Sequence, residues 1–197
     1  FVYGGAIVDG KLVGKNLMLH PWGYIEGLFE DPLNSHLGPQ GCSLFSHQFY
    51  ETDKSRGFDR GYTMQVLRGA GPVETALAGL SRRQIPWGNN HHKAFAEHFD
   101  HTVGMAIIVE DLPELDNTVT LDPILTDSND IPAPRIKYRL SDNSRKMLGH
   151  GLTKGKEVMT AAGSLKNIAF GPVRQTGWHL MGTARMGSDP SKSVVNK

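Results

Sequence analysis

Short runs of β-branched and aromatic residues, separated by Gly, Pro, Asn and Asp, predict a chain built mainly from β-strands. These runs span residues 24–29, 43–50, 62–67, 103–110, 118–121 and 135–140. Asp116 and Asn117, between the fourth and fifth runs, are typical of a hairpin turn. Because a parallel crossover needs about a dozen residues or more, we expect these two strands to be antiparallel neighbours.

The longest predicted helix covers residues 141–162. Ser141 is a natural N-cap, and Gly163 is placed to end the helix. Its apolar positions recur at near-helical spacing and are Met147, Leu148, Leu152, Val158 and Met159. Interior glycines oppose a helix, since each costs up to about 1 kcal/mol relative to alanine; here they are Gly149, Gly151 and Gly155. Shorter helices are predicted at residues 73–80 and 89–99.

The order of these elements predicts an α+β fold, a mostly antiparallel sheet of about six strands backed by helices. Strands and helices do not alternate regularly, as they would in a parallel α/β fold. No internal repeat or Pro/Gly/Ser-rich linker divides the sequence. We therefore expect one domain over residues 22–175, preceded by a connector at 1–21 and followed by a separate segment at 176–197.

Composition limits the kinds of partner that this chain can have. Of its 197 residues, 39% are hydrophobic and 21% are charged, and the net charge of +1 gives no electrostatic basis for binding nucleic acid or an anionic membrane. No apolar run is long enough to span a bilayer. The single cysteine, Cys42, excludes an internal disulfide and fits either a reducing compartment, such as the cytoplasm, or indifference to redox conditions. Because the sequence lacks an initiating Met and ends abruptly, we expect an internal fragment of a longer polypeptide.

Residues 68–74, Arg-Gly-Ala-Gly-Pro-Val-Glu, follow a predicted strand and open a predicted helix. Dinucleotide-binding loops occur in this context, because their glycines let backbone amides approach a pyrophosphate. The third glycine of such loops is missing, and Glu74 would place a carboxylate where the phosphate should sit. A strand-to-helix turn is therefore the better interpretation.

Four histidines lie close together in the sequence: His91, His92, His98 and His101. Three of them, His91, His98 and His101, could approach one another if residues 89–99 are helical, which leaves a metal-dependent hydrolase as an alternative function. Their spacing matches no helix-borne metal motif, so polar surface histidines are the default interpretation and no metal ligand is assigned. Cys42 has no neighbouring Cys or His that would mark a nucleophile, so we expect a buried apolar side chain.

His179 lies between bulky apolar residues, Trp178 on one side and Leu180-Met181 on the other. Desolvation would disfavour its charged form and keep the imidazole neutral near pH 7, where it can accept a proton. The next residues, 182–187 (Gly-Thr-Ala-Arg-Met-Gly), allow close approach of the backbone. Spacing alone favours a hydrogen-bonded structural histidine over a catalytic one and leaves both interpretations open.

Residues 179–187, His-Leu-Met-Gly-Thr-Ala-Arg-Met-Gly, resemble the C-terminal H-x-x-G-T-C-R-M-G motif of glucose–methanol–choline (GMC) oxidoreductases. Further segments resemble the same family in the same order, namely residues 12–21, 110–113 with 117–123, and 131–138 with 140–143. These matches cover nearly the whole chain, and the sub-type resembles the bacterial choline-dehydrogenase-like branch.

The resemblance implies an FAD-dependent oxidoreductase that acts on the CH–OH group of an alcohol, sugar or polyol. His179 would take the hydroxyl proton of this small-molecule substrate while hydride passes to flavin N5. Trp178 and Met181 would form walls of the substrate pocket, and Arg185 would order the loop. His20 matches a family position at the domain junction, where we expect a structural role.

The resemblance also implies that residues 22–175 form a substrate-binding domain whose partner is a flavin domain of the same polypeptide. The family's nucleotide fingerprint and second catalytic residue are not in this sequence, so no flavin-binding residue is assigned and the chain alone is expected to show no turnover. Ala184 replaces the common Cys, and Leu19 stands where many relatives have Asp, a change expected to remove a local hydrogen bond. A stand-alone sugar- or polyol-binding module without redox activity is the main alternative.

Overall fold

The computed structural model describes residues 12–38, 41–173, 179–189 and 191–196. The chain divides into two compact units, which are described separately. One, called the hairpin unit, is made of Phe1–His20, Glu110–Arg145 and Thr176–Lys197. The other, called the sheet unit, is made of Pro21–Val109 and Lys146–Gln175.

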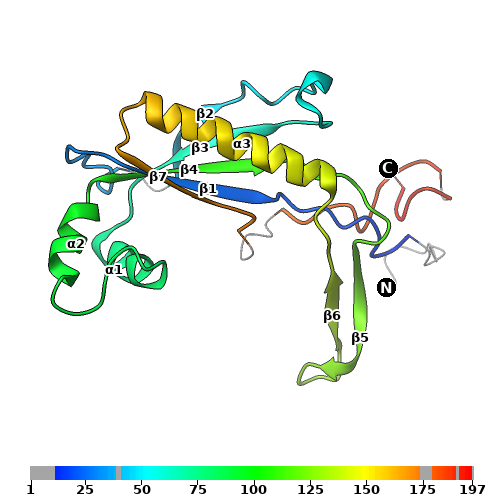
Figure 1. Cartoon of the computed structure of the whole chain (residues 1–197). Coiled ribbons are helices and arrows are strands. Elements are labelled where there is room, and N and C mark those ends of the chain that lie inside the picture. The colour runs from blue at the N-terminus through cyan, green and yellow to red at the C-terminus, as the bar shows by residue number, and fades with distance from the viewer. Residues whose placement is uncertain (1–11, 39–40, 174–178, 190, 197) are drawn as a thin grey trace. The chain divides into compact units, whose positions relative to one another are not determined.

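The sheet unit is built on a five-stranded antiparallel sheet with the strand order β2-β3-β4-β1-β7 (Figure 1). Its strands are β1 (Trp22–Leu28), β2 (Cys42–Ser46), β3 (Tyr62–Leu67), β4 (Thr102–Val109) and β7 (Lys166–Phe170). Its helical elements are η1 (Lys54–Arg56), α1 (Pro72–Ser81), α2 (His91–His98) and most of α3 (Asp142–Ala161), which begins in the hairpin unit. None of the helices among the described residues is long and apolar enough to cross a membrane.

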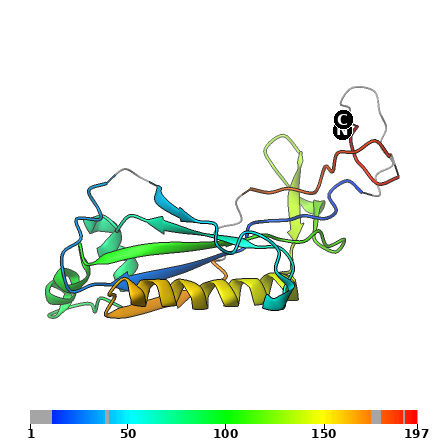
Figure 2. The same ribbon diagram turned by 90° about the horizontal axis from the view of Figure 1, so that it is seen from above.

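Helix α3 lies along one face of the sheet (Figure 2). Side chains alternate along a strand, and in β1 this places the buried Gly23, Ile25 and Gly27 toward α3. The core between sheet and helix is contiguous and includes Ile25, Met105, Ile107, Met147, Leu148 and Met159. Burying an aliphatic side chain of this size contributes about 1.5–3 kcal/mol, so this contact is the main stabilisation of the sheet unit.

Two of the interior glycines explain why α3 forms in spite of its weak intrinsic propensity. A Cβ atom on Gly151 would meet the side chain of Ile107, and a Cβ atom on Gly155 would meet Ile25. The glycines therefore let the helix backbone approach the sheet closely, and the burial gained there offsets their conformational cost.

The predicted α+β class is confirmed, and helices occur at all the predicted places. Ser141 caps α3 as predicted, because its Oγ accepts a hydrogen bond from the backbone N–H of Ser144 at 3.0 Å. Gly163 follows the helix with a φ of 96°, the left-handed conformation typical of a helix end. The sequence does not predict β7, because this strand is short and begins with the polar pair Lys166-Asn167.

The hairpin unit contains a two-stranded antiparallel ribbon of β5 (Thr118–Thr126) and β6 (Pro132–Lys137). β5 ends five residues later than predicted, whereas β6 begins and ends three residues earlier than predicted, and their register shifts between Leu121 and Thr126. Prolines interrupt sheet ladders in central strands but are tolerated at edges, and each strand of a two-stranded ribbon is an edge. This is why the proline-rich sequence around Pro134 can still form β6.

The prediction that the fourth and fifth strands are neighbours is wrong. β4 is paired on both sides, with β1 and β3, whereas β5 pairs with β6 in a separate sheet. Asn117 is not an exposed turn residue, because its side chain is buried and forms two hydrogen bonds with the backbone of Arg139. Its Nδ2 donates to the Arg139 carbonyl at 3.1 Å, and its Oδ1 accepts from the Arg139 N–H at 2.8 Å. Asn117 therefore ties the start of β5 to the chain that follows β6.

Candidate active site

The segment that follows His179 runs beside residues 14–18 in the hairpin unit. Met18 and Met181 form an antiparallel bridge, with the Met18 N–H donating to the Met181 carbonyl at 2.9 Å and the reverse bond at 3.1 Å. The Gly14 N–H extends this pairing to the carbonyl of Thr183 at 2.9 Å. Two motifs at opposite ends of the sequence thus form one local structure, which holds the backbone around His179.

Gly182 is required by this pairing. Its φ is 94°, and a Cβ atom at this position would meet the carbonyl oxygen of Asn16. Only glycine combines that backbone conformation with so close an approach of the two segments. This explains physically why a glycine stands three residues after His179.

His179 meets His20 at the end of these paired segments. Their rings are arranged edge to face, with centroids 5.1 Å apart and an angle of 86° between the ring planes. His179 is exposed and has a φ of 59°, which is uncommon outside glycine and is enriched at functional sites. The Nδ1 atom of His20 is buried and has no hydrogen-bond partner among the described residues. The pair thus offers one accessible imidazole and one ring nitrogen whose hydrogen-bonding capacity is unused.

Asp111 fixes the chain that leads to His20. Its Oδ2 accepts a hydrogen bond from the backbone N–H of Leu19 at 3.4 Å and one from the hydroxyl of Tyr138 at 2.6 Å. Its Oδ1 accepts from the Ser144 hydroxyl at 2.9 Å. Burial raises the pKa of Tyr138, and the bond to Asp111 raises it further, so Tyr138 remains a proton donor at any physiological pH.

Asn117 and Gly14 complete the support of the paired segments. The Asn117 carbonyl accepts from the Leu17 N–H at 3.0 Å, and the Gly14 carbonyl accepts from the Val119 N–H at 2.8 Å. Each of the segments that resembled the GMC family therefore contributes to this one local structure. Leu19, which the sequence predicted to lose a side-chain bond, still reaches Asp111 through its backbone.

The remaining predicted residues of the site are placed as follows. Met181 is 40% exposed, and its backbone is held by the bridge to Met18. Trp178 lies outside the described residues. Arg185 is exposed, and its carbonyl accepts a hydrogen bond from the Val194 N–H at 2.7 Å. The roles assigned to these side chains stay predictions.

The histidines considered for a metal site are each engaged with a backbone carbonyl. The Nδ1 atoms of His91, His98 and His101 lie 3.1, 2.9 and 3.2 Å from the carbonyl oxygens of Pro86, Ala94 and Phe29, respectively. Over the described part of the chain, no three His, Cys, Asp or Glu side chains gather so that they could hold a metal ion. The geometry gives no support to a metal-dependent hydrolase.

Two other sequence candidates have structural positions. Residues 68–74 join β3 to α1, with Gly71 at the N-cap of the helix and Glu74 in its first turn. Arg68 donates from Nη1 to the carbonyl of His36 at 2.9 Å. This hydrogen bond links the segment between β3 and α1 to the loop that contains His36. Cys42 lies at the start of β2, and its side chain is not among those described.

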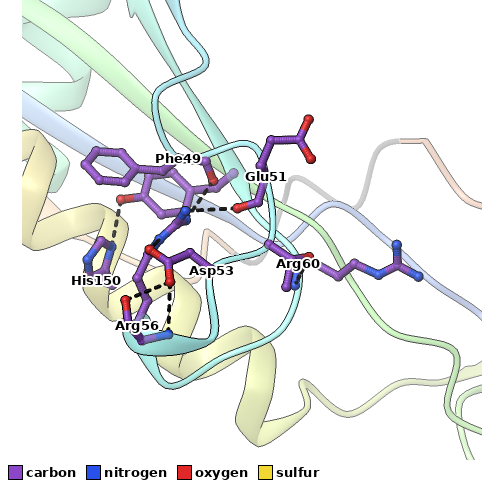
Figure 3. A network of polar contacts seen from close by, with 9 residues as sticks. Phe49, Glu51, Asp53, Arg56, Arg60 and His150 are labelled. Atoms are coloured by element: carbon purple, nitrogen blue, oxygen red, sulfur yellow. Dashed lines mark hydrogen bonds and ion pairs between the residues drawn. The ribbon is translucent and has the colours of Figure 1, made fainter.

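A second histidine site, His150 on α3, was not found from the sequence (Figure 3). The His150 Nδ1 lies 2.8 Å from the hydroxyl of Tyr62. Burial lowers the pKa of His150, and the charges of Lys154 and Arg56 lower it further, so the neutral imidazole is favoured. The helical spacing of His150 from the core residue Met147 could have indicated that it faces the sheet.

Arg56, near this histidine site, is held by hydrogen bonds and aromatic ring contacts as well as by an ion pair. Its guanidinium donates to the carbonyls of Phe49 at 3.2 Å and Glu51 at 2.9 Å, and it pairs with Asp53 at 3.4 Å (Figure 3). It also lies over the Phe49 and Phe58 rings, 5.6 and 5.9 Å from their centroids. These partners are consistent with a packing role, since each of the three guanidinium nitrogens has a hydrogen-bond partner within the protein.

The sheet unit contains a pocket of about 290 Å³ formed by the sheet, α1 and the loop that follows α1. Its walls include Tyr24 of β1 and Phe170 of β7, and its polar groups include Glu26, Arg82 and Gln84. Sequence reasoning missed this site, because its lining comes from four separate stretches, residues 22–26, 67–85, 98–102 and 170–173, that share no motif.

Comparison with known proteins agrees with this description. Residues 113–197 match the family described as GMC oxidoreductase. The chain is 38% identical over 195 residues to 2-methyl-1,2-propanediol dehydrogenase of Mycolicibacterium austroafricanum, an alignment that covers 98% of this chain and 35% of that relative. The chain belongs to the GMC oxidoreductase family, as its motifs predicted, and spans about a third of the length of this relative.

Proposed function

We propose that this chain is the substrate-binding part of an FAD-dependent alcohol oxidoreductase in which His179 accepts the proton of the substrate hydroxyl. The observation that carries this proposal is the His20–His179 pair, in which an exposed imidazole is held by a backbone bridge beside a second ring with an unused nitrogen. In this proposal Trp178 and Met181 flank the substrate, and residues 22–175 adjoin a flavin-binding part of the same polypeptide.

The chemistry assigned to His179 is removal of the hydroxyl proton. A carbinol that loses hydride from carbon must also lose this proton, or the carbonyl product would stay protonated. A neutral imidazole can accept this proton. The bridge between Met18 and Met181 fixes the backbone of the base, which reduces the entropy lost on aligning it with substrate.

FAD, when bound, supplies the acceptor for the hydride. The residues of this site fit such a neighbour, because the buried Nδ1 of His20 has no partner in the described part of the chain and a flavin ring or substrate could supply one. His20 and His179 would therefore face the reacting groups, with His20 orienting and His179 receiving the proton.

The substrate is proposed to be a small alcohol. The diol named for the Mycolicibacterium relative, 2-methyl-1,2-propanediol, is the first compound to test, because the identity of 38% extends over nearly all of this chain.

The test requires a flavin-containing polypeptide that carries residues 1–197. The rate of flavin reduction by 2-methyl-1,2-propanediol is compared between the parent and His179→Ala. Loss of a general base is expected to slow this step by about 10²–10⁴-fold. His92→Ala is the matched control, since His92 is exposed and belongs to the sheet unit. Equal rates in the parent and His179→Ala would overturn the assignment.

A further inference from the structure

The pocket in the sheet unit lies on the face of β1 that points away from the α3 core. Gly23, Ile25 and Gly27 are buried toward α3, whereas Tyr24 and Glu26, at the alternate positions, line the pocket. A carboxylate in the middle of a strand that is flanked by core residues is unusual, since acidic side chains are seldom buried without a partner. Its hydrogen-bond partners show how this carboxylate is held beside the pocket.

Glu26 is held by two donors from the loop after α1. Gln84 donates from Nε2 to Oε1 at 3.2 Å, and Arg82 donates from Nη1 to Oε2 at 3.4 Å. The Glu26 side chain is 13% exposed, so it is shielded from bulk water while still lining the pocket. Arg82 is itself held, because its guanidinium lies over the rings of Tyr24 and Phe170, 5.6 and 5.1 Å from their centroids.

This arrangement leaves hydrogen-bond acceptor capacity on the Glu26 carboxylate, which lines the pocket. A carboxylate has about four acceptor positions, and Arg82 and Gln84 use two of them. Two neighbouring hydroxyl groups can donate to the remaining positions, one to each carboxylate oxygen. The apolar side of such a ligand would lie against the edges of the aromatic walls.

The charges around the pocket disfavour a charged ligand. Glu26 and Glu74 are balanced by Arg68 and Arg82 in the lining. A cationic alcohol would have to displace the Arg82 guanidinium from the faces of Tyr24 and Phe170. An anion would meet the carboxylate of Glu26 at close range.

We propose that this pocket binds an uncharged small molecule carrying two adjacent hydroxyl groups, each of which donates a hydrogen bond to Glu26. This inference goes beyond the proposed function, because the pocket shares no residue with the histidine site and ligand binding here does not depend on the reaction assigned to His179. Gln84 and Arg82 act as positioning residues that hold the carboxylate.

The experiment measures binding to the 197-residue chain by ligand-observed NMR, without flavin. The probes are 1,2-propanediol, its single-hydroxyl counterpart 1-propanol, cationic choline and anionic lactate. We expect the diol to bind about tenfold more tightly than 1-propanol, because the latter leaves a Glu26 acceptor position unpaired. Equal affinity for these two compounds, or equally tight binding of choline or lactate, would overturn the proposal.

Variants separate recognition from folding. Glu26→Gln is expected to bring the diol and 1-propanol to within about twofold of each other, whereas Glu30→Gln, at an exposed position just after β1, should keep the preference. If Glu26→Gln does not fold, Gln84→Met provides the second test and should reduce the preference by loosening Glu26. A preference unchanged in the folded variant contradicts the assignment of Glu26. His179→Ala should keep the binding preference, so failure of the proposed reaction and failure of this inference are distinguishable.

Discussion

The imidazole rings of His20 and His179 meet edge to face with their centroids 5.1 Å apart, although the two residues lie near opposite ends of the sequence. This contact places His20 beside the proposed base. The sequence had indicated only a structural role for His20 at a domain junction. The buried Nδ1 of His20 has no hydrogen-bond partner among the described residues, so this nitrogen could have a role that is separate from the packing of the ring. Substitutions that keep the aromatic ring but remove its nitrogens can decide whether His20 only packs against His179 or also forms a functional hydrogen bond.

Replacement of His20 by Phe keeps an aromatic ring against His179 but removes both nitrogens, whereas replacement by Ala removes the ring as well. If the nitrogen orients substrate or flavin, His20→Phe should keep the melting temperature within about 2 °C and lower kcat by about tenfold or more. His20→Ala should lower both. The measurements are thermal unfolding of the chain and turnover of a flavin-containing polypeptide that carries it. Unchanged kcat in His20→Phe would restrict His20 to packing.

The close approach of the segment after His179 to residues 14–18 can be tested at Gly182. Gly182→Ala combines a strained left-handed backbone with a clash against the Asn16 carbonyl, so we expect it to destabilise the hairpin unit by about 2–4 kcal/mol. Gly163 has the similar φ of 96° but open space around its Cα. Gly163→Ala should therefore cost only the backbone strain, about 1–2 kcal/mol. Denaturant unfolding of both variants checks the difference, and equal losses would show that the clash relaxes.

The histidine site could be predicted from the sequence only through its motif. His179 has an apolar neighbourhood in sequence, but its partner His20, its support by Asp111 and its pairing with residues 14–18 depend on contacts between distant segments. The pocket around Glu26 gave no sequence signal at all, because a single Glu in an alternating strand reads as a solvent-facing residue. Such sites become visible only when the fold brings their members together.

Local patterns predicted the elements better than their pairing. Ser141 and Gly163 marked the ends of α3 correctly, because a cap depends on residues within one turn. The pairing of β4 with β5 was predicted wrongly, since alternation shows which side of a strand is buried but not which strand lies beside it. Here β1 and β3 occupy both edges of β4.

The glycines inside α3 lead to opposite expectations for one substitution. Gly149 has open space where a Cβ atom would be placed, so Gly149→Ala should raise the free energy of unfolding by about 0.5–1 kcal/mol through helix propensity. Gly155 faces Ile25 in the core, so Gly155→Ala should lower it by about 1–3 kcal/mol through overpacking. Urea unfolding monitored by circular dichroism measures both. A stabilising Gly155→Ala would show that α3 is not packed as closely as described.

The pH dependence of stability provides a test of the Tyr62–His150 contact. Burial lowers the pKa of His150 in the folded chain, so the unfolded chain, with an ordinary pKa near 6.5, binds the proton more readily. The contribution of His150 is therefore complete above about pH 6.5 and is lost as the pH falls from 6.5 through the lower folded pKa. Melting temperatures measured between pH 8 and pH 5 should decline in this window. His150→Gln, which cannot titrate but can still bond to Tyr62, should flatten the decline, whereas the exposed His92→Gln should not. An unchanged slope in His150→Gln would place the titrating group elsewhere.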